Sequence, residues 1–178
     1  MGLFGNKNNT QKPSLEATLA NRYSKAVGNI WIVFGFTLLN IILSFVDYDS
    51  YFLFSAYIPY ITVLEAAYYG TGMTTALAIA AAFLGAYLLC SILAGKGKPG
   101  WLVLAFVIFA VDSAAMVMEY GFDEDMILDL FFHAWILISL LSGILAYGKL
   151  KKVQKENAQK ASQLGELFGD YFGEKKEQ

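Results

Sequence analysis

The sequence is short of charged side chains and of cysteine. Of its 178 residues only 16% are Asp, Glu, Lys or Arg, whereas ordinary soluble domains carry about a quarter. A lone cysteine, Cys90, excludes a disulfide or a cysteine-rich metal cluster within one chain. The formal net charge of −2 provides no basic surface for nucleic acid. These absences argue against a soluble enzyme, a disulfide-stabilised scaffold and a nucleic-acid-binding protein.

Hydrophobic residues make up 57% of the chain, and many of them form long runs. A transmembrane helix requires about 20 predominantly apolar residues. The segments that reach this length are residues 26–46, 73–94, 101–119 and 127–147. Aspartates, glycines and lysines separate these runs, as is typical of polar turns. The sequence therefore predicts an all-α integral membrane protein, built as a bundle of four transmembrane helices.

Residues 51–69 form a fifth apolar stretch, which contains Pro59, Glu65 and five tyrosines. The basic residues argue against a fifth span. All 13 Lys and Arg residues fall within residues 7–25, 96–98 and 149–176. Four spans put these three segments on one side of the membrane, as the positive-inside rule requires, whereas five spans would separate them. We therefore expect residues 51–69 to form an additional outer-face helix, either interfacial or re-entrant.

This topology puts both ends of the chain in the cytoplasm. We expect a basic cytoplasmic segment over residues 1–25, a membrane domain over residues 26–148 and an amphipathic cytoplasmic tail over residues 149–178. The compact layout with short loops favours a plasma membrane. Small residues along the spans allow close helix packing, either within one bundle or against another copy of the chain or a partner membrane protein. The lipid bilayer itself is the first expected partner.

Asp112 and His133 lie well inside the predicted spans, and His133 is the only histidine. An ionisable side chain at the centre of a span costs roughly 2.5–3.5 kcal/mol on insertion scales, and it usually faces a partner or a water-filled cavity. If the last two spans form an antiparallel hairpin, residue 112 stands opposite residue 133. We therefore expect the two side chains to lie together, about 10 Å below the outer boundary of the membrane.

Further polar residues are expected around this pair. Glu119 shares a helical face with the aspartate of the pair, and Asp129 shares one with the histidine. Asn40 of the first span reaches a similar depth, and Glu65 would close the site from above. The predicted result is an outward-facing acidic cavity with residues 123–125 at its mouth and no Lys or Arg to neutralise it.

Seven tyrosines are assigned by this topology to the outer layer, at positions 48, 51, 57, 60, 68, 69 and 120. Tyrosine rings suit the lipid headgroup region, where one end of the ring is apolar and the other is wet. The alternative to such a belt is that these rings line a ligand cleft.

Carboxylates around one imidazole attract a proton, a hard or borderline metal ion, or a protonated amine. We therefore expect a protein that binds or transports a cation or a proton-coupled small solute, and a divalent metal ion is the cofactor that these residue types would suit. The alternative is a non-catalytic accessory or scaffold subunit that binds a partner protein, in which the Asp112–His133 pair only joins two helices. A carboxylate-rich, metal-dependent enzyme comes third, because the common catalytic motifs are absent and one histidine does not complete a usual zinc site.

Overall fold

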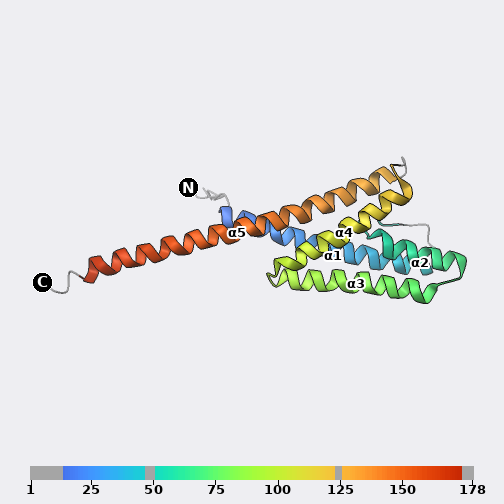
Figure 1. The fold of residues 1–178 in the computed structure, drawn as a ribbon, viewed down its shortest axis with the longest axis horizontal. Coiled ribbons are helices and arrows are strands. Elements are labelled where there is room, and N and C mark those ends of the chain that lie inside the picture. The colour runs from blue at the N-terminus through green and yellow to red at the C-terminus, as the bar shows by residue number, and fades with distance from the viewer. Residues whose placement is uncertain (1–13, 47–50, 123–125, 174–178) are drawn as a thin grey trace, which may run out of the picture.

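The computed structural model describes residues 14–46, 51–122 and 126–173. Within these ranges the chain forms five helices and no strand. In chain order they are α1 (Leu15–Phe45), α2 (Tyr57–Tyr69), α3 (Met73–Gly95), α4 (Pro99–Tyr120) and α5 (Ile127–Gly173) (Figure 1). All except α2 are long and apolar enough to cross a membrane. The predicted number of candidate spans is therefore confirmed, and four helices of this kind are the mark of an integral membrane protein.

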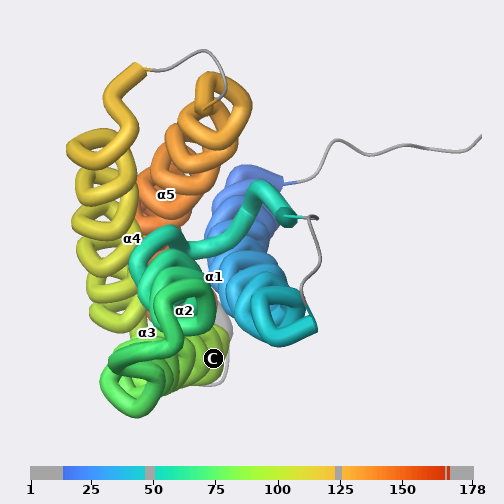
Figure 2. The backbone as a smooth tube through the Cα atoms, turned by 90° about the vertical axis from the view of Figure 1, so that its right-hand side faces the viewer, coloured from blue at the N-terminus to red at the C-terminus, as the bar shows by residue number. Residues whose placement is uncertain are grey.

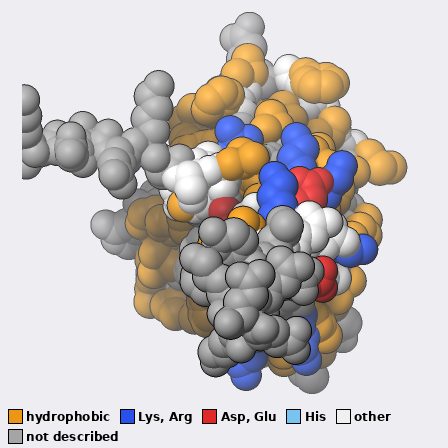
Figure 3. All heavy atoms as spheres, turned by 90° about the vertical axis from the view of Figure 1, so that its left-hand side faces the viewer, with side chains coloured by type: hydrophobic (Ala, Val, Ile, Leu, Met, Phe, Trp, Pro, Cys, Tyr) orange, Lys and Arg blue, Asp and Glu red, His pale blue; other side chains and the backbone are white. Residues whose placement is uncertain are grey.

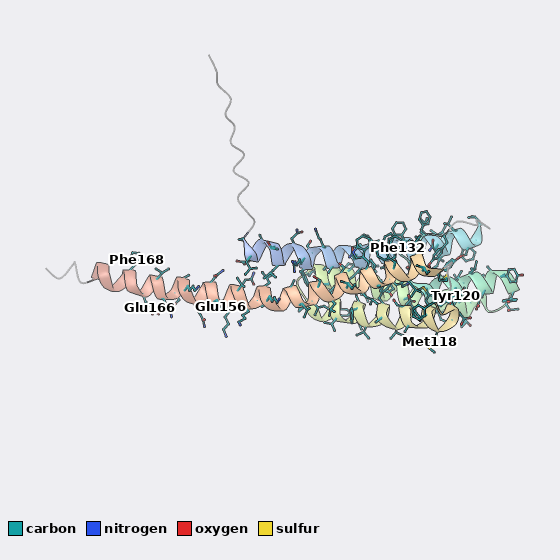
Figure 4. The ribbon with its side chains drawn as sticks, turned by 90° about the horizontal axis from the view of Figure 1, so that it is seen from above. Met118, Tyr120, Phe132, Glu156, Glu166 and Phe168 are labelled. Carbon is teal, nitrogen blue, oxygen red and sulfur yellow. The ribbon has the colours of Figure 1, made fainter. Side chains whose placement is uncertain are left out.

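α1 and α5 extend beyond the apolar runs that predicted them. α1 begins at Leu15 because Ser14 caps it, with the Ser14 hydroxyl accepting a hydrogen bond from the backbone N–H of Ala17 at 3.2 Å. α5 continues for 47 residues, because Lys, Gln, Glu and Ala, which are good helix formers, follow its apolar half. Figure 4 shows Glu156, Glu166 and Phe168 along the part of α5 that extends past the other helices.

α2 lies among the long helices at one end of the bundle. It contacts α1, α3 and α4, and the view along the bundle in Figure 2 shows it between them. With 13 residues it is only about 20 Å long, which is too short to cross a membrane. The helix predicted over residues 51–69 thus begins at Tyr57, and residues 51–56 form an irregular segment that leads into it.

Residues from all three basic segments meet at the opposite end of the bundle, within the part of the chain that the structure describes. The Tyr23 hydroxyl donates a hydrogen bond to the carbonyl of Ala94 at 2.7 Å, and the Tyr147 hydroxyl donates one to the carbonyl of Gly97 at 3.1 Å. These contacts join the first half of α1, the α3–α4 turn and the middle of α5. We call this region the lysine end, and it carries Arg22, Lys25, Lys96, Lys98 and Lys149. Figure 3 looks onto this side of the molecule and shows several Lys and Arg side chains gathered there. The other end of the bundle is called the α2 end.

α1 and α5 approach each other closely through small residues. A Cβ atom at Gly143 would overlap the Cβ of Ala26, so this position accepts no larger residue without a shift of the helices. Nearby, the Asn29 amide donates a hydrogen bond to the Ser139 hydroxyl at 2.6 Å. The small-residue contact at this position is thus made within one chain, by close backbone approach and a polar contact.

Candidate functional site

Asp112 caps the start of α2 with its carboxylate. The side chain is fully buried in the outer half of α4, counted from the lysine end. Its Oδ2 accepts a hydrogen bond from the backbone N–H of Tyr57, and its Oδ1 accepts one from that of Ile58, each at 2.8 Å. The N-terminus of a helix carries unpaired N–H groups and a partial positive charge. The partner of this buried carboxylate is therefore main chain, which is why no Lys or Arg is needed beside it.

Side chains of α1 and α4 accept hydrogen bonds from the backbone N–H groups at the start of α2. The N-cap residue is Ala56, which has no polar side chain with which to cap its own helix. Its backbone N–H donates to the Thr37 hydroxyl of α1 at 2.7 Å. The next two N–H groups bond to Asp112, and the residue after them, Pro59, has no N–H. A helix that begins inside the bundle thus leaves no donor unpaired in its first turn.

Asn40 holds the irregular segment that precedes α2. Its amide nitrogen donates to the carbonyl of Phe52 and to the hydroxyl of Ser55, both at 2.8 Å. Its amide oxygen accepts the backbone N–H of Phe52 at 2.9 Å. Asn40 is buried, as its predicted depth implies, but its hydrogen bonds are made to residues 51–56. The sequence indicated the depth of this side chain and not its partner.

His133 lies between two carboxylates. Its Nδ1 is 2.9 Å from the carbonyl oxygen of Asp129, and because a carbonyl only accepts, Nδ1 carries the hydrogen in this contact. Its Nε2 is 4.0 Å from Oδ2 of Asp112 and has no hydrogen-bond partner. The ring stacks on Phe109 with 5.1 Å between centroids and 7° between planes. The predicted proximity of Asp112 and His133 is confirmed, and Nε2 is the ring nitrogen that faces Asp112.

Asp129 is the other carboxylate of this cluster, and it has no main-chain cap. Its side chain is only 4% exposed and is hydrogen-bonded by Tyr51. Its Oδ1, which is 3.7 Å from Nδ1 of His133, has no hydrogen-bond partner among the described residues. It borders a cavity of about 260 Å³ at the α2 end. The cavity is lined by Tyr51, Leu53, Tyr57, Tyr60, Ile61, Leu64, Tyr120, Met126 and Asp129. Asp112 and His133 are not part of this lining, so the cavity reaches only the outermost member of the cluster.

Four of the seven tyrosines assigned to the outer layer line this cavity. The rings of Tyr51 and Tyr60 lie 4.9 Å apart between centroids, and those of Tyr57 and Tyr120 meet edge to face at 5.7 Å. Figure 4 shows Tyr120 at the α2 end. Burial raises the pKa values of Tyr51, Tyr57 and Tyr60, and the nearby Asp129 charge adds to this effect at Tyr51. These phenols therefore remain neutral at physiological pH.

The remaining tyrosines and acids of the predicted site lie elsewhere. Tyr68 and Tyr69 are 82% and 71% exposed, and position 48 lies outside the described residues. Glu119 is exposed near the end of α4. Glu65 is also exposed, and it lines a separate cavity of about 420 Å³ between α2 and α3 that shares no lining residue with the first. The structure thus brings Asp112, His133 and Asp129 together, but not Glu65 or Glu119.

The predicted acidic mouth, residues 123–125, lies outside the described residues. Among the residues that the structure does describe, no group of three or more His, Cys, Asp or Glu side chains is arranged to hold a metal ion. The donor set therefore gives no support for the divalent metal ion that the residue types suggested.

Comparison with known proteins assigns the chain to no family and to no function. The chain matches no protein-family model, no curated protein and no solved structure. A bundle of four membrane helices serves many unrelated functions, so function has to be argued from the site.

Proposed function

We propose that this integral membrane protein binds a cation at the α2 end, with Asp129 as the charged ligand, and that the site serves transport of the cation or of a proton-coupled small solute. One observation carries the proposal. Asp129 is a carboxylate 4% exposed, it borders a cavity, and its Oδ1 has no hydrogen-bond partner. The carboxylate has two polar neighbours, the Tyr51 hydroxyl and the His133 imidazole at 3.7 Å, but neither carries a fixed positive charge. A cation in the cavity would offset the cost of burying this negative charge.

The charges of the cluster support the uptake of a cation. Asp112 and Asp129 contribute two negative charges when both are ionised. His133 contributes at most one positive charge, when it is protonated. The N-terminus of α2, which bonds to Asp112, adds about half of a positive charge. The sequence has no Lys or Arg in residues 26–95 or 99–148. The described side chains therefore do not fully compensate this negative charge, and a bound cation or a proton would supply the missing positive charge.

The position of His133 supports coupling to protons. A proton on Nε2 would face Oδ2 of Asp112 at 4.0 Å, while the Nδ1 side of the same ring is 3.7 Å from Oδ1 of Asp129. A cation that arrives beside Asp129 would repel a positive charge on this imidazole, because like charges a few ångströms apart interact strongly in a buried site. Cation binding would then favour release of the proton from Nε2.

The proposed orientation puts the lysine end in the cytoplasm and the α2 end outside, in accordance with the positive-inside rule. Asp112 precedes Tyr120, the last residue of α4, by eight positions, which corresponds to about 12 Å along a helix. Because α2 begins at the level of Asp112, it would act as a re-entrant helix on the outer side of a plasma membrane. The cavity beside Asp129 would then open outward.

Cation binding can be tested with the full chain in lipid nanodiscs. Potassium, calcium, manganese and tetramethylammonium chlorides are titrated at constant ionic strength, and thermal unfolding and isothermal titration calorimetry are recorded. We expect at least one cation to bind and to raise the unfolding temperature of the wild type, and neither effect in Asp129→Asn. Glu65→Gln and Glu119→Gln remove the same charge from exposed positions, so they should bind as the wild type does. The proposal fails if no cation binds, or if binding survives in Asp129→Asn.

The transport part requires a separate measurement. The cation that binds is supplied outside proteoliposomes, and its uptake is followed together with the internal pH. We expect uptake that Asp129→Asn abolishes. Binding without uptake would contradict transport and would restrict the function to binding.

A further inference from the structure

We infer that the cation is organic, a small quaternary or protonated ammonium held among the rings of Tyr51, Tyr57, Tyr60 and Tyr120 with its charge toward Asp129. This inference rests on the proposed function, because it names the ligand class of the same cavity.

The lining has the two parts that an organic cation requires. Tyrosine rings attract an ammonium group through the negative charge of their faces, and this attraction is stronger where water is excluded. Four such rings, from residues 51–56, α2 and α4, surround the space. Most of the other lining residues are apolar, namely Leu53, Ile61, Leu64 and Met126. These side chains suit the methyl or methylene groups that an organic cation carries and an inorganic ion lacks.

The same lining is poorly suited to a metal ion. Calcium takes six to eight oxygen ligands, and magnesium requires a near-octahedral set. Among the residues that the structure describes, Asp129 supplies the only carboxylate of this lining. The phenols are poor substitutes, because burial raises the pKa values of Tyr51, Tyr57 and Tyr60 and keeps them protonated. A metal ion would have to retain most of its water.

The size of the cavity limits the ligand. Its volume of about 260 Å³ lies below the ~300–1,000 Å³ of sites for drug-sized molecules. A head group such as tetramethylammonium or choline fits this space, whereas a long polyamine would have to extend out of it.

Packing alone does not account for this arrangement. An aromatic cluster that served only as core would close up, because protein interiors contain few voids larger than a water molecule. Here the rings border an open space that also reaches the buried side chain of Asp129. The four rings and the buried carboxylate meet in one lining, and both suit a positively charged ligand.

The inference is tested by calorimetry with choline chloride on the full chain in nanodiscs. The neutral isostere 3,3-dimethylbutan-1-ol and potassium chloride are the comparison ligands. We expect choline to bind at least about tenfold more tightly than the neutral isostere, because only the cation gains the attraction to the rings and the carboxylate. Equal binding of the isostere would overturn the inference.

The tyrosines are tested by a matched pair of substitutions in α2. Tyr60→Leu removes a lining ring and should weaken choline binding about five- to thirtyfold, whereas Tyr60→Phe keeps the ring and should stay within about threefold. Tyr68→Leu changes an 82% exposed ring of the same helix that does not line the cavity, so it should bind as the wild type does. Tyr120→Leu, at a 42% exposed position, replaces Tyr60→Leu if that variant aggregates on size exclusion.

The outcomes separate the two proposals. Choline binding that is unchanged in both Tyr60→Leu and Tyr120→Leu would overturn the role of the rings. Binding of potassium, calcium or manganese that depends on Asp129, without binding of choline or tetramethylammonium, would overturn the ligand class and leave the proposed function standing. If none of these cations binds, both proposals are wrong.

Discussion

Asp112 and Asp129 are two buried aspartates on either side of one histidine, and they differ in what pairs with them. Asp112 receives two backbone hydrogen bonds from the start of α2. Asp129 borders a cavity and has an oxygen with no hydrogen-bond partner. The same residue type at similar burial thus has two roles, because main-chain donors approach one carboxylate and not the other. The first is a structural anchor and the second is the candidate ligand.

The two aspartates also differ in their effect on the stability of the fold. A carboxylate at a helix N-terminus satisfies buried donors and stabilises the fold, so its removal leaves those donors unpaired. A buried carboxylate with one oxygen left without a hydrogen bond lowers stability. Such a cost is typical of functional sites, where activity and stability conflict. Substitution of Asp112 should therefore lower the stability of the fold, whereas substitution of Asp129 should remove cation binding and change the stability little.

The largest effect is expected for Asp112→Ala. This substitution leaves the N–H groups of Tyr57 and Ile58 buried without acceptors, so the free energy of unfolding should fall by about 2–5 kcal/mol. Asp112→Asn should cost less, because its amide oxygen still accepts one of the two N–H groups. Equilibrium unfolding in mixed micelles of dodecyl sulfate and a mild detergent measures both. If Asp112→Ala costs no more than Asp129→Ala, the distinction between the two aspartates is wrong.

An intermediate effect is expected for Thr37→Val. The substitution keeps the shape of the side chain and removes the acceptor of the Ala56 N–H, so the free energy of unfolding should fall by about 1–3 kcal/mol. Amide hydrogen exchange over residues 51–58 should become faster, because the start of α2 is held less firmly. Thr62→Val is the matched control, since the Thr62 hydroxyl bonds only within its own helix, to the carbonyls of Ile58 and Pro59. Equal acceleration in the control would contradict the anchoring role of Thr37.

The smallest effect on stability is expected for Asp129→Asn. Removal of an unpaired buried charge should leave the free energy of unfolding within about 1 kcal/mol of the wild type or raise it. The same unfolding measurement applies, with Glu119→Gln as the exposed control. A loss as large as that of Asp112→Ala would mean that Asp129 is a second structural anchor and would remove the basis for a ligand site.

Much of the helical framework could be predicted from the sequence. Long apolar runs indicated the four candidate spans, and the short turn between the last two indicated that Asp112 would stand opposite His133. The apolar runs did not indicate that α1 begins at Leu15, because its first turns are polar. They also did not mark where α2 begins, since Ala56 gives no capping signal of its own.

The roles of the polar residues were harder to predict. Asn40 and Asp112 were expected to line an acidic cavity, but they bond to residues 52–58, through the main chain except for one bond from Asn40 to the Ser55 hydroxyl. The lack of a nearby Lys or Arg suggested an unneutralised charge, because a sequence does not reveal a helix N-terminus that arrives from elsewhere in the chain. Glu65 and Glu119 were expected to share one site, but both are exposed, and Glu65 lines a different cavity.

The sequence by itself determined the class of this protein, the number of its candidate spans and the level at which its only histidine meets an aspartate. Composition and spacing suffice for these, because the length of an apolar run and the rise of a helix are local properties. Only the tertiary structure decided which aspartate is capped, which is left unpaired and which tyrosines surround a cavity. These outcomes depend on where the irregular segment before α2 enters the bundle, and that placement results from its contacts with α1, the helix before it, and with α4, which is far away in the chain.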